Sequence, residues 1–276
     1  MPEFLSYKFE DSPAFVSTFD ELPLWSSYFG ILLLKHLELK RNLTVLDIGS
    51  GAGFPLLELA QRLGNSCVCY GIDPWMNANA RVAEKIKNYG IKNVSIIAGT
   101  GEELPFDEAS VDLIVSNLGI NNFTKPEAVF AECRRTLKPG GRLALTTNLN
   151  GHWQQFYDIF AATLRETGNG HLTESLNAHQ AHRGTVQSVS AMFSDAGLKV
   201  TRSFEDSFSM HFLDGTAFMN HYFVKLGWLG SWKELIPEKE QAGLFGKLEV
   251  NLNSYASANG GLSLTVPMAY IEGEKI

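Results

Sequence analysis

The chain has 276 residues, of which 45% are hydrophobic, and its formal net charge is −7. This length and composition can bury a full core, either as one large domain or as a domain with insertions. The acidic balance, without any Lys/Arg-rich block, disfavours a nucleic-acid-binding protein. Because no window reaches the roughly 20 apolar residues of a membrane helix, and the N-terminus lacks a signal-peptide pattern, we expect neither membrane attachment nor export.

The three cysteines of the chain are typical of a reducing compartment, so we expect a cytoplasmic protein. Cys67 and Cys69 alternate in a predicted strand and point to the same face, which favours buried thiols over ligands. Cys133 stands alone in a predicted helix. We therefore predict that the protein has no metal site.

Strands and helices alternate through the first half of the chain. The expected strands cover 43–48, 67–72, 94–98, 111–116 and 142–147, and the expected helices cover 55–63, a long stretch ending near Gly90, and 126–137. Such alternation predicts a parallel sheet covered by helices on both faces. Right-handed crossovers then bring every strand-to-helix loop to one edge, where ligands bind in open α/β sheets.

The second half adds a helix at 185–196, a sixth strand at 198–210 and a seventh at 262–271. If the sixth strand is parallel to the others, the long segments after the fifth and sixth strands both leave from the ligand edge, as lids do. We predict a single domain over 1–276, divided into an N-terminal helical cap (1–40), a cofactor-binding core (43–148) and two lid insertions (149–184 and 211–261).

The first strand runs into a glycine-rich loop, Asp47-Ile48-Gly49-Ser50-Gly51-Ala52-Gly53. Glycines suit such a loop because its turn requires positive φ and because a ligand lies against bare backbone. In the dinucleotide pattern Gly-x-Gly-x-x-Gly the third glycine would fall at position 54, which is Phe54. The loop therefore belongs to a different kind of cofactor site.

Four further motifs follow in order: Gly71-Ile72-Asp73-Pro74, then 99–106 (GTGEELPF), then 111–117 (VDLIVSN), then 135–141 (RTLKPGG). Together with the glycine loop, they resemble the class I S-adenosylmethionine-dependent methyltransferases, and more closely the ubiquinone-biosynthesis type of small-molecule enzyme. The resemblance covers 43–148. It implies a Rossmann-like seven-stranded sheet, mostly parallel with an antiparallel last strand, S-adenosylmethionine as cofactor and S-adenosylhomocysteine as product.

The resemblance also implies roles for individual residues. The backbone of Gly49 and Gly51 would approach the methionine part of the cofactor. Asp47 would organise the loop and approach the ammonium group, directly or through water, and Asp73 would accept both ribose hydroxyls. The implied cofactor-binding set is Asp47, Gly49, Ser50, Gly51, Gly53, Asp73, Pro74, Trp75, Thr100, Gly101, Glu102, Asn117 and Leu118.

The adenine contacts are open at this stage. Glu102 would edge the adenine, or it is a solvated surface charge, just as Asp73-Pro74 could simply turn the chain. Thr100 departs from the Asp of many relatives, and its hydroxyl would accept from the adenine amino group only weakly. Trp75 and Met76 would stack on or cover the adenine, or they belong to the core.

The implied reaction is attack by a substrate nucleophile on the sulfonium methyl group. The protein then mainly supplies alignment and exclusion of water, and a general base is needed only for a protonated nucleophile. We expect a small-molecule acceptor methylated at O, N or C. The alternative is an inactive S-adenosylmethionine- or S-adenosylhomocysteine-binding protein that acts as a sensor or partner subunit, and an NAD-dependent oxidoreductase is a more distant one.

The loop after the fourth strand would border the methyl group. Its Asn117, Asn121 and Asn122 could hold a polar substrate, or they could cap the next helix and bind backbone. The loop lacks the Asn-Pro-Pro-Tyr pattern of enzymes that methylate amides and adenine amino groups. Arsenite methylation requires reactive cysteines, which the predicted burial of Cys67 and Cys69 argues against.

Histidines in the insertions are the candidates for a general base, since their pKa lies near neutrality. His179, His182 and His221 are the catalytic candidates, whereas His36 is expected in the core or at a helix end. Aromatic residues of the capping segments could enclose an apolar or flat substrate, or pack the lids. The expected partner is a small molecule, without nucleic acid or membrane, and the oligomeric state, a homodimer included, is open.

Overall fold

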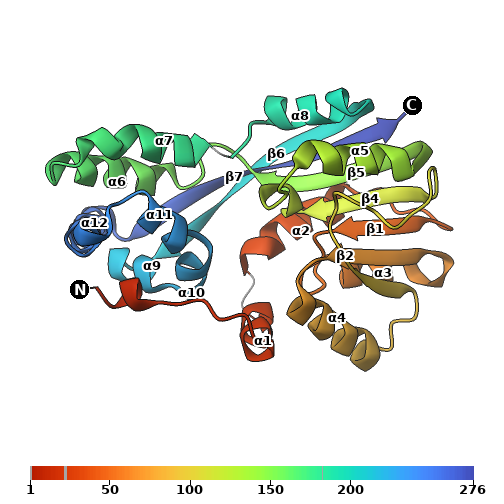
Figure 1. The fold of residues 1–276 in the computed structure, drawn as a ribbon, viewed down its shortest axis with the longest axis horizontal. Coiled ribbons are helices and arrows are strands. Elements are labelled where there is room, and N and C mark those ends of the chain that lie inside the picture. The colour runs from red at the N-terminus through yellow and green to blue at the C-terminus, as the bar shows by residue number, and fades with distance from the viewer. Residues whose placement is uncertain (1, 22–23, 182) are drawn as a thin grey trace. The chain divides into compact units, whose positions relative to one another are not determined.

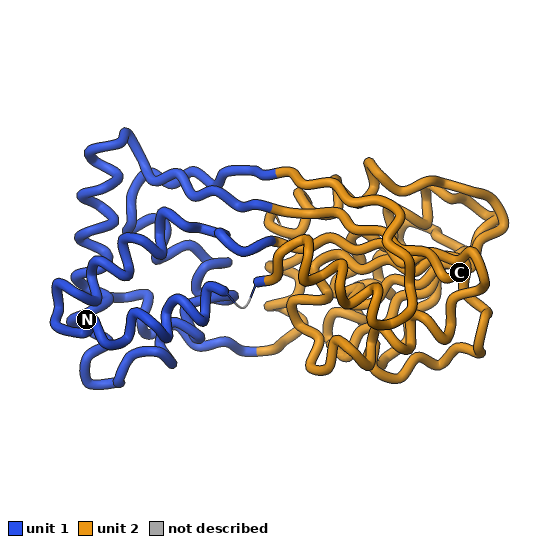
Figure 2. The backbone as a smooth tube through the Cα atoms, turned by 90° about the horizontal axis from the view of Figure 1, so that it is seen from above, with its two compact units in different colours: residues 1–10, 149–183, 207–267 blue, residues 11–148, 184–206, 268–276 orange. Residues whose placement is uncertain are grey.

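A computed structural model describes residues 2–21, 24–181 and 183–276. They form two compact units, shown in different colours in Figure 2. Unit 1 comprises Met1–Glu10, Leu149–Arg183 and Ser207–Pro267, and unit 2 comprises Asp11–Asn148, Gly184–Asp206 and Met268–Ile276. The first predicted insertion, 149–184, falls into unit 1 except for its last residue, and the second, 211–261, lies in unit 1 throughout.

The described residues form one seven-stranded sheet in the order β3-β2-β1-β4-β5-β7-β6, with helices around it (Figure 1). Strand β1 pairs in parallel with β2 and β4, β2 with β3, and β4 with β5, whereas β5 and β7 are antiparallel. This confirms the predicted fold class. The strands are β1 Thr44–Ile48, β2 Val68–Asp73, β3 Val94–Ala98, β4 Val111–Asn117, β5 Leu137–Asn148, β6 Leu198–Phe212 and β7 Leu262–Lys275.

The direction of β6 follows from one contact with β7 and one with Gly261, the residue just before β7. The Thr201 hydroxyl donates to the Glu272 carbonyl oxygen at 3.3 Å, and the Phe212 carbonyl oxygen lies against Gly261. As the residue number rises along β6, the number of its neighbour falls, so these strands are antiparallel. Since β7 is antiparallel to β5, β6 runs parallel to β5, which meets the condition set for the second insertion.

The start of β5 differs from the prediction. We expected a strand only at 142–147, after the motif at 135–141, but the strand already begins at Leu137. Leu137 pairs with Val111, and the register then shifts so that Arg142 pairs with Leu113. Pro139 and the two glycines therefore lie in an irregularity inside the strand, which accommodates residues that a regular ladder disfavours.

The helices of unit 2 show why their sequences are helical. In α3 the apolar side chains Leu56, Leu59 and Leu63 are buried on one face, and Gly64 follows with φ +68°. Helix α4 ends as predicted at Gly90, whose left-handed conformation closes the last turn. The helices of this unit are α1 Pro13–Glu21, α2 Leu24–His36, α3 Leu56–Leu63, α4 Met76–Tyr89, α5 Pro126–Thr136 and α8 Val186–Asp195.

Unit 1 has a core of its own, rich in aromatic rings. The Trp153 and Trp228 ring centroids lie 4.5 Å apart, those of Phe156 and Trp232 lie 4.4 Å apart, and Phe218 is fully buried. Packing is therefore the structural role of Phe218 and Trp228. The helices of this unit are α6 Gln154–Glu166, α7 Thr173–Ala181, α9 Gly215–Asn220, α10 Tyr222–Val224, α11 Gly230–Glu234 and α12 Glu238–Asn259, with a π-helical turn at Lys225–Leu229. Among the described residues, no helix combines the length and apolar character needed to cross a membrane.

Candidate functional site

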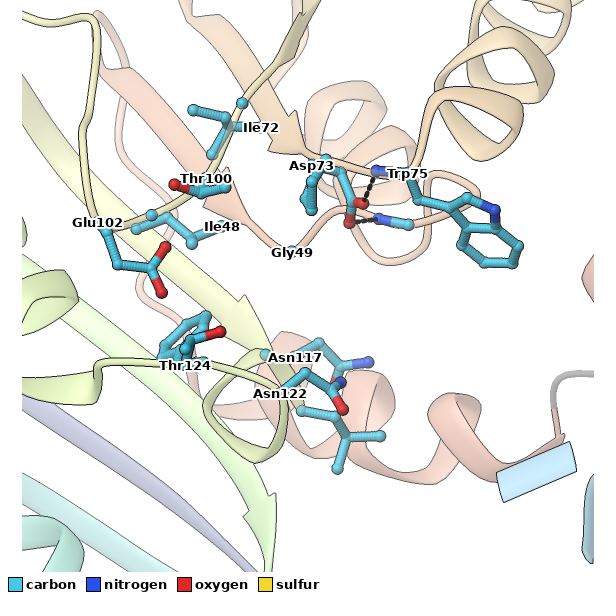
Figure 3. Close-up of a pocket in the computed structure, with 17 residues that line it drawn as sticks. Ile48, Gly49, Ile72, Asp73, Trp75, Thr100, Glu102, Asn117, Asn122 and Thr124 are labelled. Carbon is cyan, nitrogen blue, oxygen red and sulfur yellow. Dashed lines mark hydrogen bonds between the residues drawn. The ribbon is translucent and has the colours of Figure 1, made fainter. Parts of the chain in front are cut away.

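Unit 2 contains a cavity of about 350 Å³ at the carboxyl ends of β1, β2 and β4 (Figure 3), a volume typical of ligand pockets. Three residues of the predicted cofactor set do not line this cavity, namely Asp47, Ser50 and Gly53. Some residues outside the predicted set do line it. Ten of the predicted cofactor-binding residues line the cavity: Gly49, Gly51, Asp73, Pro74, Trp75, Thr100, Gly101, Glu102, Asn117 and Leu118. The additional lining residues are Ile48, Ile72, Gly99, Gly119, Asn122, Phe123 and Thr124.

The glycine loop has the backbone conformation that its sequence predicts. Gly49, Gly51 and Gly53 all have positive φ, at +77°, +49° and +99°, a region that other residues adopt only with strain. A Cβ added to Gly30 of α2 would lie only 2.1 Å from the Phe54 ring. The phenyl ring therefore packs on that helix, which explains why this loop has an aromatic residue where a dinucleotide loop has glycine.

Asp73, the last residue of β2, joins the glycine loop to the start of α4. Its Oδ2 accepts from the Gly51 backbone N–H at 2.8 Å, and its Oδ1 accepts from the Trp75 backbone N–H at 2.8 Å (Figure 3). A carboxylate has about four acceptor sites, so these two bonds leave a further lone pair on each oxygen. Asp73 can thus fix two walls of the cavity and still accept two hydroxyl groups.

Asp47 is completely buried behind the loop. Neither carboxylate oxygen has a hydrogen bond of normal geometry among the described residues, and the Leu56 backbone N–H favours the ionised form only in small part. Burial, aided by the negative charge of Asp73, raises the pKa of Asp47 to about 8. A buried polar group without a partner is costly, and a bound ammonium group or water would remove that cost.

We expect Asp47 to make the unliganded protein less stable as the pH rises. In the unfolded chain the pKa of an aspartate is about 3.9. Between that pH and about pH 8, Asp47 is therefore protonated in the folded state and ionised in the unfolded state. Stability then decreases with increasing pH across this window. The Asp47→Asn variant should show a flatter dependence in urea unfolding at pH 5 and pH 8. The same slope in both proteins would contradict this role of Asp47.

Glu102 reaches across the cavity wall toward Thr124 (Figure 3). Burial opposes its ionisation, but hydrogen bonds from its own backbone N–H, the Thr100 hydroxyl and the N–H groups of Lys125 and Thr124 hold its pKa below the usual value. The Lys125 N–H bond measures 3.4 Å. Glu102 is therefore an ionised, hydrogen-bonded part of the wall rather than a freely solvated charge.

The Trp75 side chain packs outside the cavity. Its indole N–H donates to Asp11 Oδ1 at 2.8 Å, and its ring centroid lies 6.2 Å from that of Phe15 and 6.0 Å from that of Phe19. Figure 3 shows the indole turned away from the other lining residues. Packing thus describes the ring, and Met76 beside it is exposed.

The three asparagines after β4 differ in their contacts. The Asn117 side chain donates to the Ser26 carbonyl oxygen at 3.1 Å and accepts from the Thr146 hydroxyl at 2.8 Å. Asn121 donates to Asn148 Oδ1 and accepts from the Thr147 hydroxyl, both at 2.9 Å. These two amides are used within the fold, so Asn122, which lines the cavity, is the one best placed for a ligand.

The two predicted catalytic histidines that the structure describes, His179 and His221, belong to unit 1. His179 lies in α7 with its ring centroid 6.3 Å from that of Tyr157, and His221 lies edge-on to Phe212 at 5.4 Å. His182 lies outside the described residues. Burial, with the nearby Lys225 charge, lowers the pKa of His221 and keeps it neutral. The cavity belongs to unit 2, so a catalytic role for these histidines stays a prediction. His36 ends α2 and stacks on Phe204, as expected of a helix-end residue.

All three cysteines are buried free thiols, which confirms the expected burial. Burial raises the pKa of Cys69 to about 12, and Cys133 is shifted in the same direction for the same reason. Thiols in this state are poor nucleophiles and ligands because the reactive form is the thiolate. In the part of the chain that the structure describes, no three His, Cys, Asp or Glu side chains are grouped to hold a metal ion.

The sheet order, the glycine loop and the carboxylate at the end of β2 are those of the class I methyltransferase fold. Residues 46–145 match the family model described as "Methyltransferase domain". This matched segment contains the glycine loop, Asp73 and most of the cavity lining, so the similarity to that domain covers the site itself.

Similar proteins agree with this assignment. The arsenite methyltransferase of Halobacterium salinarum is 29% identical over 56% of this chain and 37% of its own length. The demethylmenaquinone methyltransferase of Listeria welshimeri is 26% identical over 61% of this chain and 75% of its own length. The structure of a SAM dependent methyltransferase from Aquifex aeolicus is 25% identical, covers 71% of this chain and 92% of its own, and superposes with a TM-score of 0.54. The chain thus spans only part of the curated relatives' lengths, and in the first of them little more than a third.

Proposed function

We propose that this protein binds S-adenosylmethionine in the cavity of unit 2 and transfers its methyl group to a small-molecule acceptor. The observation that carries the proposal is the position of Asp73. This residue faces the cavity, and its carboxylate accepts hydrogen bonds from the N–H groups of Gly51 and Trp75. The residues around it fit the cofactor. The positive-φ glycines leave room for a ligand against backbone, and the partnerless Asp47 carboxyl suits a cationic group.

In the proposed arrangement each residue has a distinct binding task. The backbone of Gly49 and Gly51 holds the methionine part, and Asp47, which lies behind the loop and does not line the cavity, organises that loop and reaches the ammonium group through water. Asp73 accepts the two ribose hydroxyls with its remaining lone pairs. Thr100 and Glu102 border the adenine, with Glu102 kept ionised by its hydrogen bonds. Ser50 and Gly53 act through the shape of the loop, because neither lines the cavity.

When bound, the cofactor supplies an electrophilic methyl group, so the protein has to orient the acceptor and exclude water. Asn122 offers a side-chain amide on the cavity wall for the acceptor. We propose that the insertions 149–184 and 211–261 enclose the acceptor, because each follows a strand that ends at the cofactor edge. His179, His182 and His221 are candidates to take a proton from an acceptor that arrives protonated.

The relatives suggest which acceptors to test first. The burial of all three thiols argues against arsenite, the substrate class in the name of the Halobacterium protein. A reduced naphthoquinone is the first choice, since several relatives are named demethylmenaquinone methyltransferases. Whether the methyl group goes to oxygen, nitrogen or carbon follows from the structure of the product.

The test uses radiolabelled S-adenosylmethionine with a fractionated small-molecule extract and with reduced naphthoquinone. We expect label in at least one acceptor fraction, and much less label with the Asp73→Ala variant at a cofactor concentration that saturates only the unaltered protein. Tight S-adenosylhomocysteine binding without transfer to any fraction would instead establish the inactive sensor or partner subunit. Binding of NADH without a response to S-adenosylhomocysteine would overturn the cofactor assignment.

A further inference from the structure

Helix α1 is fastened to α4 by a charged cluster. The Asp20 carboxylate pairs with Arg81 at 3.0 Å and with Lys85, which lies one helical turn further along α4. Only 10% of the Asp20 side chain and 16% of the Lys85 side chain are exposed, compared with 29% for Arg81. Ion pairs that are largely withdrawn from water are screened less than surface pairs, so the Asp20–Lys85 pair is the stronger link.

Lys85 makes a second bond that Arg81 does not make. Its Nζ donates to the Ala52 carbonyl oxygen at 2.7 Å. Ala52 stands between Gly51 and Gly53 in the glycine loop, where the Gly53 N–H closes a turn onto the Ser50 carbonyl oxygen at 2.9 Å. The Lys85 ammonium therefore holds the carbonyl group of a loop residue that has a glycine on each side.

A separate set of contacts connects α1 and the segment before it to the opposite wall of the cavity. Trp75, whose backbone N–H binds Asp73, has its indole held by Asp11 and by the rings of Phe15 and Phe19. The 11–21 segment thus has contacts leading to both cavity walls, to the glycine loop through Lys85 and to the Asp73 turn through Trp75.

We propose that Lys85 and Asp20 are positioning residues of the cofactor site. Lys85 holds the Ala52 carbonyl so that the loop presents the backbone of Gly49 and Gly51 to the cofactor, and Asp20 holds Lys85 in place. A loop ordered before binding loses less conformational entropy when the ligand arrives. This inference rests on the proposed function, since it concerns the same cavity.

The experiment measures S-adenosylhomocysteine affinity by titration calorimetry in four variants and the unaltered protein. Lys85→Met removes both bonds and should weaken binding about 10-fold, a step smaller than the loss of a direct charged hydrogen bond. Asp20→Asn leaves the Ala52 bond and should weaken binding less. Arg81→Met is the matched control, because Arg81 lies on the same helix and pairs with the same carboxylate, and it should change the affinity less than twofold. Lys85→Arg keeps the positive charge and should retain most of the affinity of the unaltered protein.

Hydrogen exchange of the amides of residues 49–53 supplies a readout that general destabilisation does not mimic. Exchange there should be faster in unliganded Lys85→Met than in Arg81→Met, at a temperature where circular dichroism shows both proteins folded. Equal affinities for these two variants would overturn the positioning role. If the unaltered protein itself does not bind S-adenosylhomocysteine, the proposed function fails instead, so the two failures are distinguishable.

Discussion

Asp73→Ala should bind S-adenosylhomocysteine about 100-fold more weakly than the unaltered protein, a loss of roughly 3 kcal/mol. The upper part of the range for hydrogen bonds to a charged group applies, because the variant loses more than the ribose contacts. It also frees the Gly51 and Trp75 N–H groups, which hold the two walls of the cavity. Titration calorimetry at neutral pH measures the effect directly.

Two further variants test whether the affinity depends on the charge of the Asp73 carboxylate in particular. Asp73→Asn keeps the shape of the side chain but turns an NH₂ group toward one of the backbone donors, so we expect a loss close to that of alanine. Asp107→Ala, an exposed carboxylate of the same unit, should bind like the unaltered protein. Unchanged affinity in Asp73→Ala would remove this residue from the ribose.

The core around the glycine loop was predictable because its signals are local. Apolar strands ended by acids, glycines at positive φ and helix stops such as Gly90 act within a few residues of themselves. Ile48, the last residue of β1, and Ile72, the last but one of β2, line the cavity but were not predicted. They could have been found, because the final residues of a strand at the ligand edge face whatever lies beyond it.

Contacts between distant residues were not predictable in this way. Lys85 and Asp20 are 65 positions apart, and Asn117 binds the Ser26 carbonyl oxygen across 91 positions. Nothing in the local pattern says that Trp75 would turn toward α1 rather than toward a ligand. The direction of such a side chain depends on which helix packs against it. The position of that helix depends in turn on the packing of the whole unit.

A second large effect is expected from a substitution of Glu272, which lies near the C-terminal end of β7. The carboxylate is 2% exposed and is bound by Arg202 at 2.7 Å, by Arg142 at 3.6 Å and by the Tyr270 hydroxyl. Burial, followed by the interaction with this carboxylate, raises the pKa of Tyr270, so the phenol stays protonated and donates. Three polar side chains, from β5, β6 and β7, thus depend on one buried charge.

Glu272→Ala should lower the free energy of unfolding by about 3–5 kcal/mol, because it leaves buried partners without their counter-charge. Glu38→Ala is the matched control, since Glu38 also pairs with Arg142, at 3.1 Å, but is 53% exposed. Screening by water should make its effect much smaller than that of Glu272→Ala. Urea unfolding followed by circular dichroism compares the two. Similar losses in both variants would mean that Glu272 contributes no more than a surface charge, and that the strand pairing of β7 is held by its backbone and apolar side chains instead.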